Sequence, residues 1–201
     1  MDDPISISQR TFDRLAEAAL QESDADEPED ERDRVEAFLM RTGRPVPNVV
    51  VLGQKLAMRC RQIEELGGSA VGVDGGGFVV ELARRRYPGG NFQRGDLRKL
   101  PVETNAFDGV WSGSTIANIP RAEIAKAMQS MHDALRPGGL LYVRLPLGDD
   151  EGFQETGHGP VYTVRWDAEQ FCQAVSALDF SMLDQQPVGD SELAMIFRRE
   201  Y

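Results

Sequence analysis

The strongest constraint on the fold is the repeated alternation of short apolar runs with helical patterns between residues 48 and 145. NVVVLG (48–53) precedes a helical pattern over 55–66, and SAVGVD (69–74) precedes another over 78–86. The series continues with NFQ (91–93), FDGVWS (107–112), a helical pattern over 121–135 that the string RPGG ends, and LLYVRL (140–145). Apolar strands that alternate with helices are typical of a parallel sheet covered on both faces. The sequence therefore predicts an α/β fold with a doubly wound sheet.

The C-terminal end of the chain breaks this alternation. A helix is predicted to follow Asp167, which is placed to cap it, with Gln170 three residues later in a variant of the capping box. Two strand patterns then follow, FSMLDQQ (180–186) and ELAMIFRR (192–199), and the link between them is too short for a helical crossover. These two strands must therefore pair antiparallel.

The N-terminal end carries two helical patterns and most of the acidic charge. One pattern covers 8–21 and the other 33–40, and residues 22–36 hold nine carboxylates against two arginines, which gives −7 of the chain's net −11. We interpret residues 1–44 as a helical N-terminal piece with an acidic linker, and residues 45–201 as the α/β domain. The acidic run is expected to be a solvated linker; the alternative is a contact for a basic protein partner.

Composition excludes several classes of function. A net charge of −11 argues against an extended phosphate-binding surface, so nucleic acid is not an expected partner. No apolar run approaches the roughly 20 residues that span a bilayer, and the N-terminus is acidic where a signal peptide is basic. We expect a cytoplasmic protein with no membrane contact. Cys60 and Cys172 lie far apart without C-x-x-C spacing, so they predict neither a disulfide framework nor a metal site.

Several strings then occur in an order known from one family. They are FDRLAEA, VVVLGQKLA, VGVD, GDLRKLPVETNAFDGVWS and LRPGGLLYV, followed by the closing helix and strand pair. From about residue 12 onward the chain resembles the class I S-adenosylmethionine (SAM) dependent methyltransferases of the small type-11 group. The resemblance implies SAM as cofactor and a Rossmann-like sheet of seven strands, with an antiparallel last strand lying between the fifth strand and FSMLDQQ. It also implies that helix 8–21 closes over the cofactor as a lid, with Phe12 facing inward.

The same resemblance assigns cofactor contacts one by one. Gly53 is the first glycine of the cofactor loop, and Asp74 accepts hydrogen bonds from both ribose hydroxyls. Asp96 accepts from the adenine amino group while the Leu97 amide meets the ring, and Ser112 is a further contact at the end of the fourth strand. Two alternatives remain open: Asp74 caps the following helix, and Asp96 is an ordinary turn residue.

The glycine-rich loop departs from the family pattern D/E-x-G-x-G-x-G. The matching positions are Val51, Gly53, Lys55 and Ala57, so only the first glycine remains. A middle glycine allows positive φ and close approach of the backbone to the ligand, whereas Lys55 is expected to project into the methionine end of the pocket. Alternatively, the Lys55 ammonium pairs with the SAM carboxylate and replaces backbone amides with charge.

The sequence offers few candidate residues for binding the methyl acceptor and identifies no catalytic residue. After the fourth strand, TIANIP supplies Thr115 and Asn118 but no general base. Residues 147–166 are expected to form a long surface loop able to act as a lid, and it carries His158, Tyr162 and Trp166 as candidate substrate contacts. The expected acceptor is a small molecule or a protein side chain.

Three hypotheses follow for the function. The first is a SAM-dependent methyltransferase, and the second is a catalytically inactive homologue that binds a partner because Lys55 and Ala57 replace loop glycines. The third, an NAD-dependent oxidoreductase, needs G-x-G-x-x-G after the first strand, where GQKLAM supplies only the first glycine.

Overall fold

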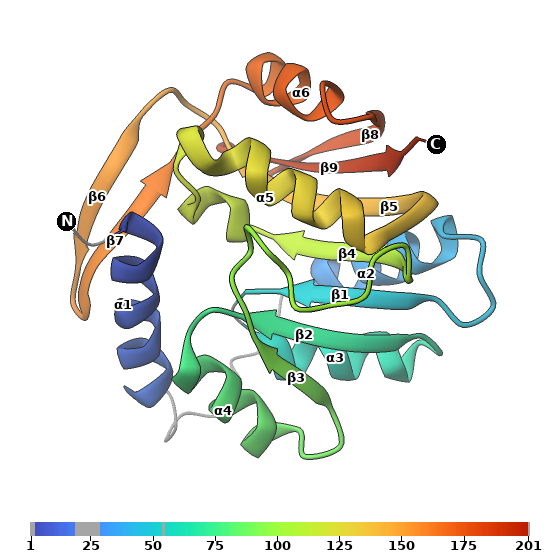
Figure 1. The fold of residues 1–201 in the computed structure, drawn as a ribbon, viewed down its shortest axis with the longest axis horizontal. Helices are drawn as coiled ribbons and strands as arrows, with labels where there is room; N and C mark the ends of the chain where they lie inside the picture. The colour runs from blue at the N-terminus through green and yellow to red at the C-terminus, as the bar shows by residue number, and fades with distance from the viewer. Residues whose placement is uncertain (1–2, 19–28, 54, 201) are drawn as a thin grey trace.

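A computed structural model describes residues 3–18, 29–53 and 55–200 of the chain, and Figure 1 shows its arrangement. The helices are α1 (Pro4–Ala18), α2 (Glu29–Arg41), α3 (Leu56–Glu65), α4 (Gly77–Arg86), the short 3₁₀ helix η2 (Thr115–Asn118), α5 (Arg121–Ala134) and α6 (Ala168–Ser176). The strands are β1 (Asn48–Leu52), β2 (Ser69–Asp74), β3 (Asn91–Arg94), β4 (Phe107–Gly113), β5 (Leu135–Pro146), β6 (Glu151–Thr156), β7 (Gly159–Val164), β8 (Phe180–Val188) and β9 (Glu192–Arg199).

The central sheet has seven strands in the order β3-β2-β1-β4-β5-β9-β8. β1 to β5 pair parallel, whereas β9 pairs antiparallel with both β5 and β8. The last strand therefore lies between the fifth strand and β8, which confirms the predicted fold class and topology. The strand order reverses between β1 and β4, and open α/β sheets bind ligands at this switch point.

Helices cover both faces of the sheet because successive residues of each strand point to opposite sides. Val50 and Leu52 belong to the core under α5 and α6, while Val49 and Val51 belong to the core under α2, α3 and α4. Figure 1 shows α5 in front of the sheet and α2 and α3 behind it. No described helix is long and apolar enough to cross a membrane.

Two predictions for the ends of elements are settled by backbone geometry. Asp167 caps α6, since its side chain accepts a hydrogen bond from the Gln170 amide at 2.9 Å, as predicted. The prediction that RPGG separates helix from strand is wrong, because β5 already begins at Leu135. The register with β4 jumps between Leu135 and Leu140, so residues 136–139 form a bulge in which Gly138 has φ +79°.

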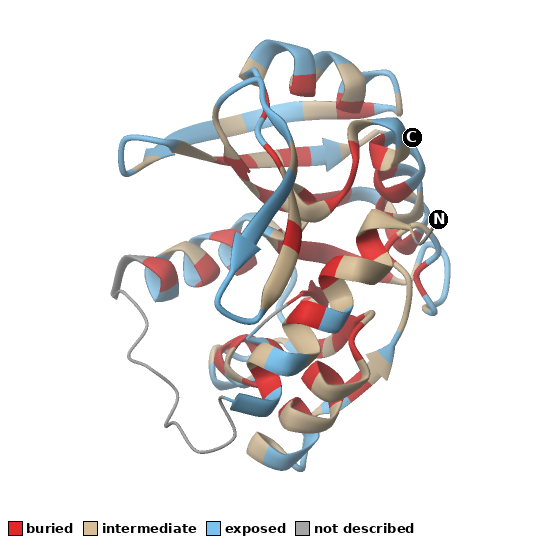
Figure 2. Ribbon diagram, turned by 90° about the vertical axis from the view of Figure 1, so that its left-hand side faces the viewer, coloured by how far each residue is buried: buried red, intermediate tan, exposed pale blue. Residues whose placement is uncertain are grey.

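The expected surface loop at 147–166 is instead an antiparallel hairpin of β6 and β7. Its exposed sequence hides the strand signal, because β6 has no buried residue and offers little apolar alternation. Figure 2 shows the hairpin standing on the surface beside α1.

The expected acidic linker is also partly wrong. Residues 22–28 lie outside the described part of the chain, but α2 begins at Glu29, so the second half of the acidic run is helical. Glu31 is only 7% exposed, which a solvated linker residue would not be. Of the two cysteines, Cys60 is fully buried and Cys172 partly buried, and both are free.

Candidate functional site

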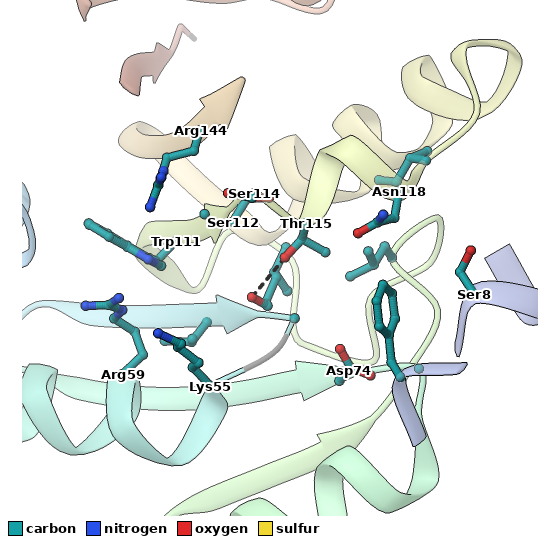
Figure 3. Close-up of a pocket in the computed structure, with 18 of the residues that line it drawn as sticks. Ser8, Lys55, Arg59, Asp74, Trp111, Ser112, Ser114, Thr115, Asn118 and Arg144 are labelled. Atoms are coloured by element: carbon teal, nitrogen blue, oxygen red, sulfur yellow. Dashed lines mark hydrogen bonds between the residues drawn. The ribbon is translucent and has the colours of Figure 1, made fainter. Parts of the chain in front are cut away.

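A cavity of about 530 Å³ lies over the C-terminal ends of β1, β2 and β4, at the switch point of the sheet. Side chains from the strand ends, α1, α2, α3 and η2 surround it (Figure 3). Its volume is within the range of about 300–1,000 Å³ that is usual for small-molecule sites. The predicted site residues that line it are Gly53, Lys55, Asp74, Leu97, Ser112 and Asn118.

Asp74 ends β2 and is the acidic group at one end of the cavity. It is 8% exposed, and its Oδ1 accepts a hydrogen bond from the Gly76 amide at 2.7 Å. Burial raises its pKa to about 6, against the lowering effect of the Gly76 bond and with a further rise from the charge of Asp13. Asp74 thus closes a local turn before α4, whose first amides bond Asp13 instead. It also lines the cavity, and its contact with the ribose stays a prediction.

The loop after β1 keeps an open cavity despite its changed residues. Gly53 has φ +86°, and a Cβ at this position would collide with the Thr115 hydroxyl, which donates to the Leu52 carbonyl. Glycine is therefore required at position 53. Lys55, the N-cap of α3, itself adopts the left-handed conformation with φ 60° and ψ 27°. Lysine thus takes the backbone geometry expected of glycine, at a cost of about 1–2 kcal/mol.

The other two loop changes have different consequences. Val51 is fully buried and lines the cavity with an apolar surface where the family pattern has an acid. Ala57 is buried and lines a separate cavity of about 250 Å³ between α1, α3 and α4. Neither change fills the main cavity.

Ser112 is an unsatisfied polar group at the end of β4. Its side chain is fully buried and lines the cavity, and its Oγ has no hydrogen-bond partner among the described residues. Buried hydroxyls normally have a partner, so this Oγ indicates that a polar ligand atom or water belongs beside it. Figure 3 shows Ser112 near Ser114 and Thr115 at the centre of the cavity.

Asp96 does not line the cavity, whereas its neighbour Leu97 does. The Asp96 carboxylate is held by the Arg98 guanidinium through bonds of 2.7–3.1 Å, which lowers its pKa. Arg98 also pairs with Asp3, just before α1, at 2.8 Å. The structure therefore favours a structural role for Asp96, and its predicted contact with adenine gains no support from its position.

Helix α1 and the hairpin cover the cavity together. Phe12 lines the cavity with Ile5, Ser8 and Gln9. Ser8 and Thr11, rather than the apolar positions of the helix, bind the hairpin: Thr11 Oγ1 donates to the Pro160 carbonyl at 2.7 Å and Ser8 Oγ accepts from the Tyr162 amide at 2.8 Å. The inward position of Phe12 matches the prediction.

Of the four candidate substrate contacts, only Asn118 lies at the cavity, and it donates to the Tyr162 carbonyl at 2.9 Å. His158 is exposed at the hairpin turn, and Tyr162 donates its hydroxyl to Glu151. Trp166 is buried against Phe171, with Arg121 stacked over its ring. None of these last three side chains lines the cavity, so the structure does not bring them to the site.

Sequence reasoning missed a charged network at the end of the cavity opposite Asp74. Glu31 of α2, Arg59 of α3 and Arg144 of β5 line the cavity there. Glu31 lies 3.4 Å from Arg59 and 3.5 Å from Arg144, and Arg144 also pairs with Glu192. The available signal was charge inside otherwise apolar elements: Arg144 interrupts LLYVRLP, and Glu31 lay within a run attributed to a linker.

The comparisons with known proteins agree with this arrangement. A family model described as a methyltransferase domain matches residues 53–143. The demethylmenaquinone methyltransferase of Chlorobaculum tepidum is 30% identical over 81 residues, which are 40% of this chain and 33% of that protein. The matched segment thus spans about a third of the length of this curated relative.

Solved structures extend the likeness over the whole chain at low identity. The 1,6-didemethyltoxoflavin-N1-methyltransferase of Burkholderia thailandensis, with its namesake substrate and S-adenosylhomocysteine bound, has a TM-score of 0.70, 19% identity and coverage of 100% of this chain and 94% of its own. A complex of DhpI with S-adenosylhomocysteine has a TM-score of 0.74, 17% identity and coverage of 100% and 99%. The methyltransferase-domain match over residues 53–143, the sheet order and the similar solved structures all agree with the fold of the class I SAM-dependent methyltransferases.

Proposed function

We propose that this protein binds SAM in the cavity above β1, β2 and β4 and transfers its methyl group to a small molecule. The observation that carries the proposal is the buried Asp74 carboxylate at the end of β2, facing a cavity at the switch point of a methyltransferase sheet. The relatives named above act on, or are bound to, small molecules, which supports a small-molecule acceptor over a protein side chain.

The residues present fit the cofactor. Asp74 and Leu97 both line the cavity, so the Asp74 carboxylate would accept from the ribose hydroxyls and the Leu97 amide would meet the adenine. The unpartnered Ser112 hydroxyl would bind a polar atom of the amino-acid end. Among the described residues no carboxylate pairs with Lys55, which leaves its ammonium for the cofactor carboxylate in place of the lost glycine loop.

Bound SAM supplies an electrophilic methyl group, and the protein's part is to orient the acceptor and exclude water. Helix α1 and the β6–β7 hairpin would exclude water, since both contribute residues to the cavity lining and they are hydrogen-bonded to each other. Ser114, Thr115 and Asn118 supply polar groups that can orient an acceptor. None of these is a general base, so the acceptor must already be nucleophilic.

The test is methyl transfer from radiolabelled SAM into a small-molecule extract. The wild type should label a discrete product, and Asp74→Asn should lower the rate at sub-saturating SAM by about tenfold or more, because hydrogen bonds to a charged acceptor contribute about 1.5–3 kcal/mol. Asp133→Asn, a change at an exposed site late in α5, is the matched control and should leave the rate unchanged. Equal rates in all three proteins would refute the role of Asp74.

The inactive homologue is the second candidate, and the left-handed Lys55 is the observation that favours it. If the lysine occupies space needed by the cofactor, wild type binds no SAM and the cavity serves another ligand. The open volume of about 530 Å³ with Lys55 in place argues for the enzyme.

A further inference from the structure

The charge at one end of the cavity is opposite to the charge of the chain. Lys55, Arg59 and Arg144 line this end, with Glu31 as the only carboxylate there among the described lining residues. Arg34 approaches Glu31 as well, at 4.0 Å. Figure 3 shows Lys55, Arg59 and Arg144 gathered around Trp111, on the far side of the cavity from Asp74. In a chain of net charge −11, an excess of cations at one cavity wall needs an explanation.

Arg59 and Arg144 are largely buried, which strengthens their attraction for an anion. The side chains of Arg59 and Glu31 are 7% and 9% exposed, and that of Arg144 is 27% exposed. Guanidinium groups so placed have lost much of their hydration, and water screens them weakly, so they attract an anion far more strongly than surface arginines do. Among the described ion pairs, Glu31 lies beside Arg34, Arg59 and Arg144, and Glu192 pairs with Arg144.

The wall is rigid as well as charged. Arg59 bonds Gln62 at 2.6 Å and lies 5.0 Å over the Trp111 ring. Trp111 stacks on Tyr142 with ring centroids 3.8 Å apart. The Tyr142 hydroxyl is buried without a hydrogen-bond partner among the described residues, as is Ser112 Oγ in the cavity itself. Preorganised donors beside unsatisfied hydroxyls are what an oxyanion site requires.

We propose that Lys55, Arg59 and Arg144 form a subsite for an oxyanion, either a carboxylate or a phosphate-type group. Two molecules can supply this group: an acceptor that carries an acid function, or the amino-acid end of the cofactor. The first source rests on the proposed methyltransferase function and makes the substrate an organic acid or phosphate ester. The subsite itself does not depend on methyl transfer.

Trp111 allows a direct measurement. The chain has two tryptophans, so Trp166→Phe leaves Trp111 as the single reporter, in contact with Arg59. Its fluorescence would be followed during titration with benzoate and with inorganic phosphate, each with saturating S-adenosylhomocysteine present. Separate titrations would use S-adenosylhomocysteine and 5′-methylthioadenosine, which lacks the amino-acid end.

The test variant is Arg144→Met, and Arg165→Met is the control, because Arg165 is an exposed arginine paired with Asp150 and does not line the cavity. Two further variants guard against misfolding. The double variant Arg144→Met with Glu192→Gln also removes the carboxylate that would lose its partner, and Arg144→Lys keeps the positive charge. Thermal melts would establish that each variant is folded.

Either source gives a distinct result. An acid-bearing acceptor predicts saturable binding of benzoate or phosphate that Arg144→Met weakens at least tenfold, with S-adenosylhomocysteine affinity unchanged. The cofactor source predicts that Arg144→Met weakens S-adenosylhomocysteine at least tenfold and leaves 5′-methylthioadenosine unchanged. If folded Arg144→Met matches Arg165→Met for every probe, the subsite does not exist. Wild type that binds neither adenosine ligand but still binds an oxyanion would refute the proposed function and keep the subsite.

Discussion

At Lys55 the backbone adopts a conformation that is unfavourable for a residue with a side chain. A left-handed backbone places its Cβ too close to the following carbonyl, which costs about 1–2 kcal/mol for any residue but glycine. The structure nevertheless has Lys55 at φ 60° as the N-cap of α3. Strain of this kind persists where the surroundings impose it and is common at ligand sites. Lys55 is such a case, since it lines the cavity.

Relief of this strain should be measurable. Lys55→Gly is expected to raise the free energy of unfolding by about 1 kcal/mol over Lys55→Ala, because alanine keeps the Cβ and glycine does not. Urea denaturation of the two variants measures the difference. Both lack the ammonium, so both should bind S-adenosylhomocysteine more weakly than wild type. Equal stability of the two variants would show that position 55 is unstrained.

Asp74 should make ligand binding depend on pH. Burial raises its pKa from 3.8 to about 6, so in the free protein the carboxylate is protonated below that pH. A protonated Asp74 loses acceptor capacity for ribose hydroxyls, and S-adenosylhomocysteine affinity should therefore fall as pH drops from 7.5 through 6 to 5. In Asp74→Asn the affinity should be lower and flat over this range. A pH-independent wild type would contradict the ribose role.

The raised pKa of Asp74 also determines how this residue's contribution to folding stability changes with pH. Between pH 3.8 and about 6 the folded state binds a proton at Asp74 that the unfolded state does not. The contribution of this residue to stability is therefore fully present below pH 3.8 and is lost as pH rises through about 6. Asp74→Asn should remove this slope from the pH dependence of the free energy of unfolding, with Asp133→Asn as control.

Two elements, α1 and the β6–β7 hairpin, are expected to behave as one lid. Their connections are side-chain bonds from Ser8 and Thr11 to the hairpin backbone and from Arg14 to the His158 carbonyl. Ligand binding should slow hydrogen exchange in residues 3–18 and 151–164 together, while α6 and β8 stay unchanged. Thr11→Val should reduce the protection of both segments. Protection of one segment without the other would show that they move independently.

Glu31 of helix α2 pairs with the buried Arg59 of α3 and with Arg144 of β5. Removing one partner of a buried ion pair costs about 3–5 kcal/mol. Glu31→Ala should therefore lower the free energy of unfolding by about 3 kcal/mol. Glu36→Ala, at an exposed position of the same helix, should change it by less than about 0.5 kcal/mol. Similar effects of both changes in urea denaturation would show that Glu31 is not a structural anchor.

At the scale of the whole molecule, the apolar pattern of strands such as VVVLG and VGVD predicted a parallel sheet, and the short link before β9 predicted its antiparallel pairing with β8. The seven-stranded sheet with β9 between β5 and β8 was predicted from the family resemblance and not from the pattern. The β6–β7 hairpin was not predicted, because the residues that bind it, Ser8 and Thr11, lie about 150 positions away in the chain. The burial of Glu31 was not predicted either, because a carboxylate within an acidic run is expected to be exposed, and only tertiary contacts bury it.

The candidate site likewise contains residues that could be predicted from the sequence and residues that could not. Gly53, Asp74, Leu97 and Ser112 were assigned to the site from the family resemblance, and all four line the cavity, which lies where parallel strands bring their C-terminal ends to one edge. The pairing of Asp96 with Arg98 and the convergence of Arg59 and Arg144 on Glu31 were not, since side-chain partners across elements leave no periodic signal. Lys55 lies at the cavity as predicted, and it adopts the positive φ that a glycine takes more cheaply.

The central claim is that this molecule binds the cofactor although Lys55 and Ala57 stand where the family has glycines. Calorimetric titration with S-adenosylhomocysteine tests it, in wild type and in the double variant Lys55→Gly with Ala57→Gly. We predict saturable one-to-one binding by wild type and weaker binding by the double variant, which lacks the ammonium. Absence of binding by wild type at millimolar ligand, together with binding gained by the double variant, would contradict the account and identify an inactive homologue.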